Sequence, residues 1–185
     1  MKKLLLMSAI LALSLSATAN AAALDFTAMA DQTVTSIGGV TFSLAGTGEL
    51  GGPTTDSRYG GGLWNSADGA YYPTNTILKA EFDTNASGIM FDFDNEGSKL
   101  TSWSLFDSSN ILITTGALST GFFDLSSYTG VKSIEWNNGG NNWLFALETL
   151  TYETSAVPVP AAVWLMGSGL LGLMGFSRKN KKLAA

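Results

Sequence analysis

The chain of 185 residues contains no cysteine and no histidine. The absence of cysteine excludes a disulfide framework, a thiolate nucleophile and cysteine-ligated zinc or iron–sulfur sites. The absence of histidine excludes a Ser-His-Asp triad and imidazole metal ligands. The chemistry that remains belongs to carboxylates, hydroxyls, amides, aromatic rings and a few lysines.

Positive charge is also scarce, since 10 Lys and Arg stand against 15 Asp and Glu, for a net charge of -5. All the acidic residues lie between Asp25 and Glu153, a segment with four basic residues and a net charge of -11. Those four are Arg58, Lys79, Lys99 and Lys132. The acidic balance argues against a nucleic-acid partner, because such binding needs a basic patch. The other basic residues lie at the two ends, beside apolar stretches, and this arrangement is typical of an exported protein.

The N-terminal end has the pattern of a secretory signal peptide. Lys2 and Lys3 precede the apolar run Leu4–Leu15, and Ala19 and Ala21 form an A-x-A cleavage site. We therefore expect residues 1–21 to pass the Sec translocon and to be removed by signal peptidase. An uncleaved anchor is the alternative, but the apolar run is shorter than the roughly 20 residues that a membrane span needs.

The C-terminal end, residues 156–185, has the pattern of a single transmembrane helix. Residues 154–177 carry no charge, and the 21 residues from Val157 onward are long enough to cross a bilayer. A basic cluster follows at once, formed by Arg178, Lys179, Lys181 and Lys182. Such clusters stay cytoplasmic, so the acidic segment is expected on the periplasmic side of the inner membrane.

The sequence Val157-Pro158-Val159-Pro160, followed by A-A-V-W-L-M-G-S-G-L, resembles the PEP-CTERM sorting signal of Gram-negative bacteria. The resemblance implies recognition by an exosortase, cleavage near the prolines and transfer to the cell surface or extracellular matrix, often in strains that make exopolysaccharide. Val159 stands where the name-giving motif has Glu. The prolines hold the chain extended before the helix, which suits a protease substrate. A permanent anchor of a periplasmic domain is the alternative. A glycosylphosphatidylinositol signal fits less well, because it ends in its hydrophobic tail.

Residues 22–155 are predicted to form an all-β domain, an antiparallel β-sandwich resembling a jelly roll, because short β-branched and aromatic runs alternate with Gly, Asn, Asp and Ser. The expected strands are Thr33–Ile37, Val40–Leu44, Ile77–Asp83, Ile89–Asp94, Leu100–Phe106, Ile111–Thr115, Gly121–Leu125, Val131–Trp136 and Leu144–Glu153. Gly38-Gly39 is expected to form a turn, and residues 137–142 a hairpin loop between the last two strands. Residues 49–76 are expected to form a long irregular loop.

One acidic group is a candidate calcium site. Asp92, Asp94 and Glu96 open like an EF-hand loop, but its twelfth position is Trp103 where a bidentate Glu is required. A looser site with oxygen ligands remains open, and the alternative is a solvated strand face that enters a polar turn.

Four aromatic residues are candidates for carbohydrate binding. Trp64, Tyr71 and Tyr72 lie in the expected long loop, and Trp143 flanks the Asn-rich loop. Aromatic faces stack on sugars, while amides and carboxylates bind their hydroxyls. The alternative is that these rings pack the loops onto the sandwich.

The sequence thus predicts a non-enzymatic, exported protein with a structural or exopolysaccharide-binding β-domain and no cofactor other than calcium. A polysaccharide-acting hydrolase is the alternative. Such an enzyme needs a pair of carboxylates about 5–10 Å apart, and among 15 acidic residues some pair will meet this requirement. A purely structural matrix protein, without a glycan ligand, is the third interpretation.

Overall fold

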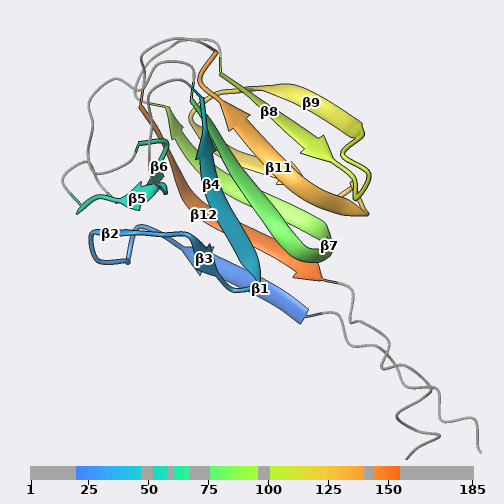
Figure 1. Cartoon of the computed structure of the whole chain (residues 1–185), viewed down its shortest axis with the longest axis horizontal. Helices are drawn as coiled ribbons and strands as arrows, with labels where there is room; N and C mark the ends of the chain where they lie inside the picture. The colour runs from blue at the N-terminus through green and yellow to red at the C-terminus, as the bar shows by residue number, and fades with distance from the viewer. Residues whose placement is uncertain are drawn as a thin grey trace, which may run out of the picture. The chain divides into compact units, whose positions relative to one another are not determined.

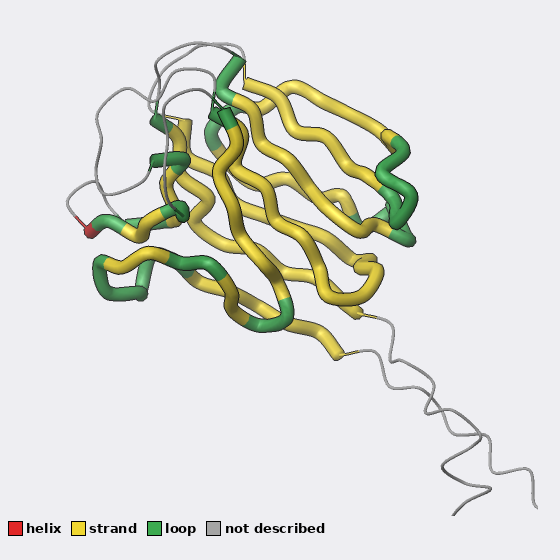
Figure 2. Tube along the Cα trace, viewed as in Figure 1, coloured by secondary structure: helices red, strands yellow, loops and turns green. Residues whose placement is uncertain are grey.

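A computed structural model describes residues 20–46, 52–57, 61–66, 76–95, 101–139 and 144–154, with the backbone alone at position 95. They belong to one compact unit, residues 18–156, and most of them lie in strands (Figures 1 and 2). The strands are β1 (Asn20–Asp25), β2 (Gln32–Thr33), β3 (Ser36–Ile37), β4 (Val40–Ala45), β5 (Thr54–Thr55), β6 (Leu63–Trp64), β7 (Ile77–Asn95), β8 (Thr101–Phe106), β9 (Leu112–Leu118), β10 (Gly121–Leu125), β11 (Val131–Asn137) and β12 (Phe145–Thr154). No helix in these ranges is long and apolar enough to cross a bilayer.

Strand β7 belongs to both layers of an antiparallel sandwich, because it bends back near its middle (Figure 1). Its first half, Ile77–Phe82, pairs with β4 and β11. Its second half, from residue 86 to residue 95, pairs with β12 and β10. The first layer therefore has the order β3-β4-β7-β11-β8-β9. The second layer has the order β10-β7-β12, and the far side of β12 pairs with both β1 and β6. Strands β5 and β2 follow β6. The expected sandwich is confirmed.

The bend of β7 is held by polar contacts to its backbone. Asp83 N donates to the carbonyl oxygen of Gly39 at 2.9 Å. The Lys132 ammonium donates to the carbonyl oxygens of Phe82 and Asp83, the latter at 3.2 Å. Both carbonyls lie where the pairing of β7 with β4 ends, and the ammonium gives each of them a charged donor there. Gly88 follows with a φ of 59°, a conformation that glycine adopts without a side-chain penalty.

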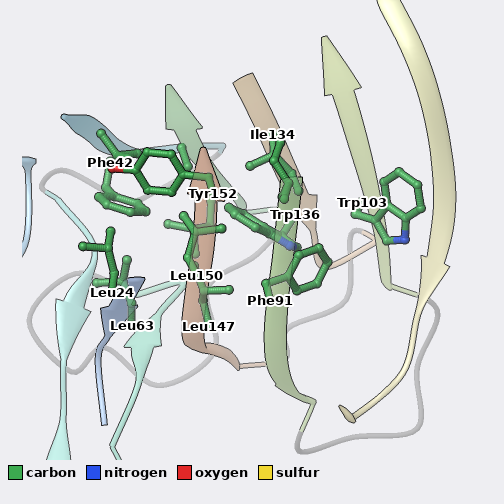
Figure 3. Close-up of a cluster of buried hydrophobic side chains, with 14 of the residues drawn as sticks. Leu24, Phe42, Leu63, Phe91, Trp103, Ile134, Trp136, Leu147, Leu150 and Tyr152 are labelled. Atoms are coloured by element: carbon green, nitrogen blue, oxygen red, sulfur yellow. The ribbon is translucent and has the colours of Figure 1, made fainter. Parts of the chain in front are cut away.

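The core lies between the layers and is rich in aromatic rings (Figure 3). The Phe82 and Tyr152 ring centroids are 4.9 Å apart, which packs the first half of β7 on β12. The Phe91 and Trp136 centroids are 5.5 Å apart, which packs the second half of β7 on β11. The Tyr152 hydroxyl donates to the carbonyl oxygen of Gly38, so the one polar atom of this buried ring is satisfied.

Burial in β7 follows the alternation of apolar and polar residues in its sequence. Leu78, Ala80 and Phe82 are buried, whereas Lys79 and Glu81 between them are half-buried. In the second half of β7 the residues Ile89, Phe91 and Phe93 are fully buried. Trp103 and Trp136, which lie within expected strands, are buried in the core. The Gly38-Gly39 turn is also confirmed, with φ values of 62° and 81° between β3 and β4.

The predicted hairpin over residues 137–142 is wrong. Strand β11 pairs with β7 and β8, while β12 pairs with β1, β6 and β7. The chain between them therefore crosses from the first layer to the second. The Asn- and Gly-rich composition indicates a turn of the chain, but it does not say whether the flanking strands become partners.

Three strand predictions also need correction. The strands expected at Ile77–Asp83 and Ile89–Asp94 are one continuous strand, β7. The strand expected at Thr33–Ile37 is two short pieces: β2 pairs with β5 and β3 pairs with β4, because Val34 between them turns into the core. The loop expected over residues 49–76 contains the paired strands β5 and β6. Strand β1 was not expected, because the signal-peptide pattern overlaps its first residues.

Candidate functional site

The outer face of the second layer carries one row of side chains across four strands. Phe122 on β10 lies opposite Asp92 on β7, Asp92 lies opposite Thr149 on β12, and Thr149 lies opposite Asp25 on β1. Directly opposed residues of antiparallel strands share a face and lie about 5 Å apart. An aromatic ring, two carboxylates and a hydroxyl therefore stand side by side on this row.

Phe122 points away from the core because its neighbour points into it. The Phe123 ring stacks on Phe91 at a centroid distance of 5.0 Å and an interplanar angle of 17°. Successive side chains of a strand point to opposite faces, and 63% of Phe122 is exposed to solvent. Asp124, the next residue on the Phe122 face, is also exposed.

Carboxylates crowd the same face. Glu148 lies at a register shift of β12 between Leu147 and Thr149, and its side chain is half-buried. Its pKa is raised above the ordinary value, first by burial and then by the negative charges of Asp92, Asp94 and Asp25. These four carboxyl groups therefore form one acidic group on β1, β7 and β12.

The other members of the acidic group differ in their hydrogen bonds. The pKa of Asp25 is lowered, chiefly because its carboxylate accepts the Thr27 hydroxyl at 2.7 Å, together with the Thr27 amide at 3.0 Å. Asp92 accepts the amide of Phe93 at 3.0 Å. Asp94 accepts the hydroxyl of Thr120 at 3.5 Å. Oxygen atoms of the group that are not used in these bonds can accept hydrogen bonds from a ligand.

The calcium prediction is not tested by this geometry. Asp92 and Asp94 lie on the outer face as expected, but Glu96 lies outside the described residues. Within the described ranges, no set of three or more acidic side chains has an arrangement that could hold a metal ion. Calcium binding through Asp92, Asp94 and Glu96 stays a prediction.

Two buried asparagines fasten the chain at one end of the sandwich. The backbone N–H of Asn65 donates to the carbonyl oxygen of Phe145 at 3.2 Å. The side-chain oxygen of Asn65 accepts the backbone N–H of Phe145 at 2.9 Å. Asn138 makes the same reciprocal pair with Thr76, at 3.2 and 3.0 Å. Each asparagine thus extends a ladder beyond the last strand residue.

The two pairs lie at the same end of the sandwich. In the sequence, residues 67–75 follow Ser66 and precede Thr76, and residues 140–143 follow Gly139 and precede Leu144. Because β7 bends back, its first and last residues also lie at this end. The predicted aromatic residues Tyr71, Tyr72 and Trp143 belong to these two segments and lie outside the described residues.

Trp64 is not an exposed sugar platform. It lies on β6, between Ala146 of β12 and Thr54 of β5, and 2% of it is exposed. The interpretation that this ring packs a loop onto the sandwich therefore holds, because a buried ring has no free face for stacking. Its burial follows from the unexpected strand β6, which makes residues 63 and 64 part of the second layer.

Phe122 was missed by sequence reasoning, although a signal for it existed. Phe122 and Phe123 are adjacent in a strand, so one of the two rings has to face away from the core. Leu125 shares a face with Phe123, and Asp124 shares a face with Phe122, so the alternation itself indicates that Phe122 is the outward ring.

The residues predicted for export and sorting mostly lie outside the described ranges. These are Ala19, Val157, Pro158, Val159, Pro160, Arg178, Lys179, Lys181 and Lys182. Ala21 is described and lies in β1 opposite Glu153. Cleavage after Ala21 would remove the first two residues of β1 and leave Ala22–Asp25 paired with β12.

No family model matches this sequence, and no curated protein matches it. Several solved structures share a general likeness to this chain. A variant of the carbohydrate-binding module CBM29-2 in complex with mannohexaose is 16% identical, covers 75% of this chain and 94% of its own, and has a TM-score of 0.44. A Streptococcus pneumoniae fucose binding module is 10% identical, covers 49% and 70%, and has a TM-score of 0.38.

The lectin binding domain of Lectinolysin, in complex with Lewis b, is 6% identical, covers 49% of this chain and 69% of its own, and has a TM-score of 0.38. With TM-scores below 0.5 these likenesses assign no function to this chain, and the functional argument rests on its own residues.

Proposed function

We propose that this chain is an exported cell-surface or matrix protein whose β-sandwich binds exopolysaccharide on the outer face of the second layer. The observation that carries the binding proposal is the exposed Phe122 ring opposite the Asp92 carboxylate. A sugar ring has an apolar face that stacks on an aromatic ring and hydroxyls that donate to carboxylates. The row through Phe122, Asp92, Thr149 and Asp25 offers both kinds of contact on one face.

The charge of the domain narrows the class of glycan. Residues 22–155 carry a net charge of -11, and the acidic group lies on the proposed binding face. An anionic polymer would be repelled from this face unless cations bridge the two. We therefore expect neutral polysaccharides to bind in the absence of divalent cations.

Binding is tested with a glycan array, followed by calorimetry with the strongest neutral oligosaccharide. Phe122→Ala removes the stacking surface and is expected to weaken binding at least about tenfold, the effect of roughly 1.4 kcal/mol. Asp92→Asn is expected to weaken binding less, because the amide keeps one acceptor. Thr41→Ala changes an exposed residue on the outer face of the first layer and serves as the control.

Two outcomes would contradict the proposal. Full affinity in Phe122→Ala would exclude this face as the binding site. A domain that binds no glycan on the array would have the purely structural role in the matrix.

A hydrolase is the second candidate, and the raised pKa of Glu148 beside Asp92 is the observation that favours it. Glycosidases use one protonated and one ionised carboxyl group. Release of reducing ends from a bound polysaccharide, abolished by Glu148→Gln, would support this candidate. Binding without release would leave the non-enzymatic proposal.

The proposal includes export by the Sec route and removal of the tail by an exosortase near Val157-Pro158-Val159-Pro160. The support is the resemblance of residues 157–182 to the sorting signal, together with the basic residues at both ends. Mass spectrometry of the protein from its native host tests both steps. The mature chain should begin at Ala22 and end near Pro160. An intact tail through Ala185 in the membrane fraction would instead show a permanent anchor.

A further inference from the structure

Ile111 and the first residues of β9 expose apolar side chains at the edge of the first layer. Ile111, Leu112 and Ile113 are 63%, 51% and 37% exposed. Together with Phe122, they are the large apolar residues that stand exposed in the described part of the chain. Three consecutive exposed apolar residues at a sheet edge differ from the scattered exposure that is normal on protein surfaces.

The backbone of β9 is open along one side. It pairs with β8 through residues 112–118, and no other described strand pairs with it. An edge strand presents unpaired amide and carbonyl groups along its open side, which can add a further strand. Among the other edges, β2 and β3 have two residues each and offer much shorter templates, while β1 ends in Asp25 and β10 contains Asp124, so both of these edges carry a charge.

The position of β9 in the sandwich keeps this edge accessible. Ring contacts place β12 against the first half of β7, and the second half of β7 against β11. Counting outward along each layer, β8 then faces β10, the last strand of the second layer, and β9 lies beyond it. The Trp103 indole covers the inner side of β9 at Gly116, where an added Cβ would come within 2.6 Å of the ring.

Natural edge strands are commonly protected by charges or proline, and β9 has neither. No charged residue occurs from Ser108 to Phe123. The preceding Asp107 is engaged in its own turn, because its carboxylate accepts the amides of Ser109 and Ile111 at 2.8 and 2.9 Å. One irregularity exists, a register shift between Leu105 and Phe106, and it leaves residues 114–118 in regular pairing.

From this edge we propose that the domain self-associates, β9 pairing antiparallel with β9 of a second copy about a two-fold axis. We assign a second copy as the occupant because β9 is complementary to itself in sequence and is an edge at which a like-charged domain meets little repulsion. Two domains of net charge -11 repel each other over most of their surface, and β9 is an uncharged edge along which they can approach. The inference does not depend on whether the Phe122 face binds glycan.

The sequence of β9 is complementary to itself in one register. With the two-fold axis at Thr115, all seven residues of the strand find a partner in the second copy. Leu112 then lies opposite Leu118, and Ile113 lies opposite Ala117, so apolar residues meet at both ends. The exposed residues Ile113, Thr115 and Ala117 share the outer face, where the two first layers continue as one sheet.

The contact is smaller than a standard protein interface, which buries about 800 Å² on each partner. Association is therefore concentration-dependent. It should strengthen as ionic strength rises, because salt screens the repulsion between the two acidic domains. An association driven by salt bridges would show the opposite dependence.

Sedimentation velocity of residues 18–156 tests the proposal. This fragment retains the whole hydrophobic core, which lies between Leu24 and Tyr152. The average mass should rise with concentration, and Ile113→Lys should weaken association at least about tenfold. Thr41→Lys adds the same charge on β4, away from the edge, and should leave association unchanged. A wild-type fragment that stays monomeric at high concentration and high salt, or equal effects of the two lysines, would overturn the proposal.

Paired substitutions test the register. Ile113→Lys combined with Ala117→Lys places like charges opposite each other across the two-fold axis and should abolish association. Ile113→Lys combined with Ala117→Glu places opposite charges there and should restore it. Both positions are exposed, so the fold should survive, and circular dichroism checks this. Failure of the second pair to associate better than the first would exclude this register.

Discussion

At the scale of single residues, burial of Trp136 stabilises the fold through its apolar area and also carries a free-energy cost from its polar atom. Trp136 is the largest fully buried side chain among the described residues, yet its indole nitrogen has no hydrogen-bond partner there. A buried donor without a partner costs about 1–3 kcal/mol. The benefit of this side chain therefore comes from its size and not from its polar atom.

Trp136→Phe should destabilise the domain by less than about 1.5 kcal/mol, because the lost volume is offset by removal of the unpaired donor. Trp136→Ala should cost about 3–5 kcal/mol, because it leaves a cavity beside Phe91. Denaturant unfolding of both variants measures the difference. Similar losses for the two would mean that the indole nitrogen is satisfied in solution.

Glu148 makes stability depend on pH. Its pKa is raised in the folded state, so over the range between the ordinary and the raised value the folded protein holds more protons than the unfolded chain. The free energy of unfolding therefore falls as pH rises through this range, and the loss persists at neutral pH.

Glu148→Gln should raise the melting temperature at pH 7, by the equivalent of less than about 1 kcal/mol, because the carboxyl group is partly solvated. The gain should disappear below about pH 4, where Glu148 is protonated in the folded wild type. Glu135→Gln removes one charge from the outer face of the first layer and serves as the control. Equal gains for both variants would assign the effect to net charge alone.

Much of the residue-level pattern could be predicted from the sequence. Alternation in the two halves of β7 identified Leu78, Phe82 and Phe91 as core residues, because a half-buried strand has a period of two. Trp64 could not be placed, because it lies in a strand too short to show a period.

At the scale of elements, the bend of β7 depends on a side chain that is distant in sequence. The Lys132 ammonium bonds to the carbonyl oxygens of Phe82 and Asp83, and it lies 3.8 Å from a carboxylate oxygen of Glu81. Sequence reasoning predicted a break near Asp83 but could not find Lys132, because the contact joins β11 to β7. It also could not tell a continuous bent strand from two strands and a loop.

Lys132→Met should therefore destabilise the domain by about 1–2 kcal/mol, because two carbonyl groups lose their charged donor. Lys79→Met is a matched control: the side chain of Lys79 is 28% exposed, against 29% for Lys132, and its ammonium pairs with the Glu81 carboxylate at 3.2 Å. Surface pairs of that kind contribute little. Chemical denaturation compares the two, and an equal loss would contradict a special role for the bend contacts.

At the scale of the whole molecule, the first strand overlaps the predicted signal-peptide cleavage site. Strand β1 covers the edge of β12 beside the buried Leu24 and Tyr152. The signal-peptide pattern predicted a boundary after Ala21 but could not show that a strand runs through it. The pairing of Asn20 with Thr154 depends on a contact between distant parts of the chain.

A fragment of residues 22–156 should be as stable as residues 18–156, because it keeps the pairing of Ala22–Asp25. A fragment of residues 26–156 should melt several degrees lower, since it loses Leu24 and exposes the edge of β12. Differential scanning calorimetry measures both. Equal melting temperatures for the two shorter fragments would show that β1 is dispensable.

The central place of β12 has a mechanical consequence. The chain leaves the sandwich at Thr154, and β12 is bonded on one side to β7 and on the other to β1 and β6. A domain held by its C-terminal tail and pulled through a bound ligand would transmit the force along β12. Ladder hydrogen bonds run perpendicular to their strands, so this pull would shear many of them together. An edge strand under the same tension would be held by the ladder on one side alone.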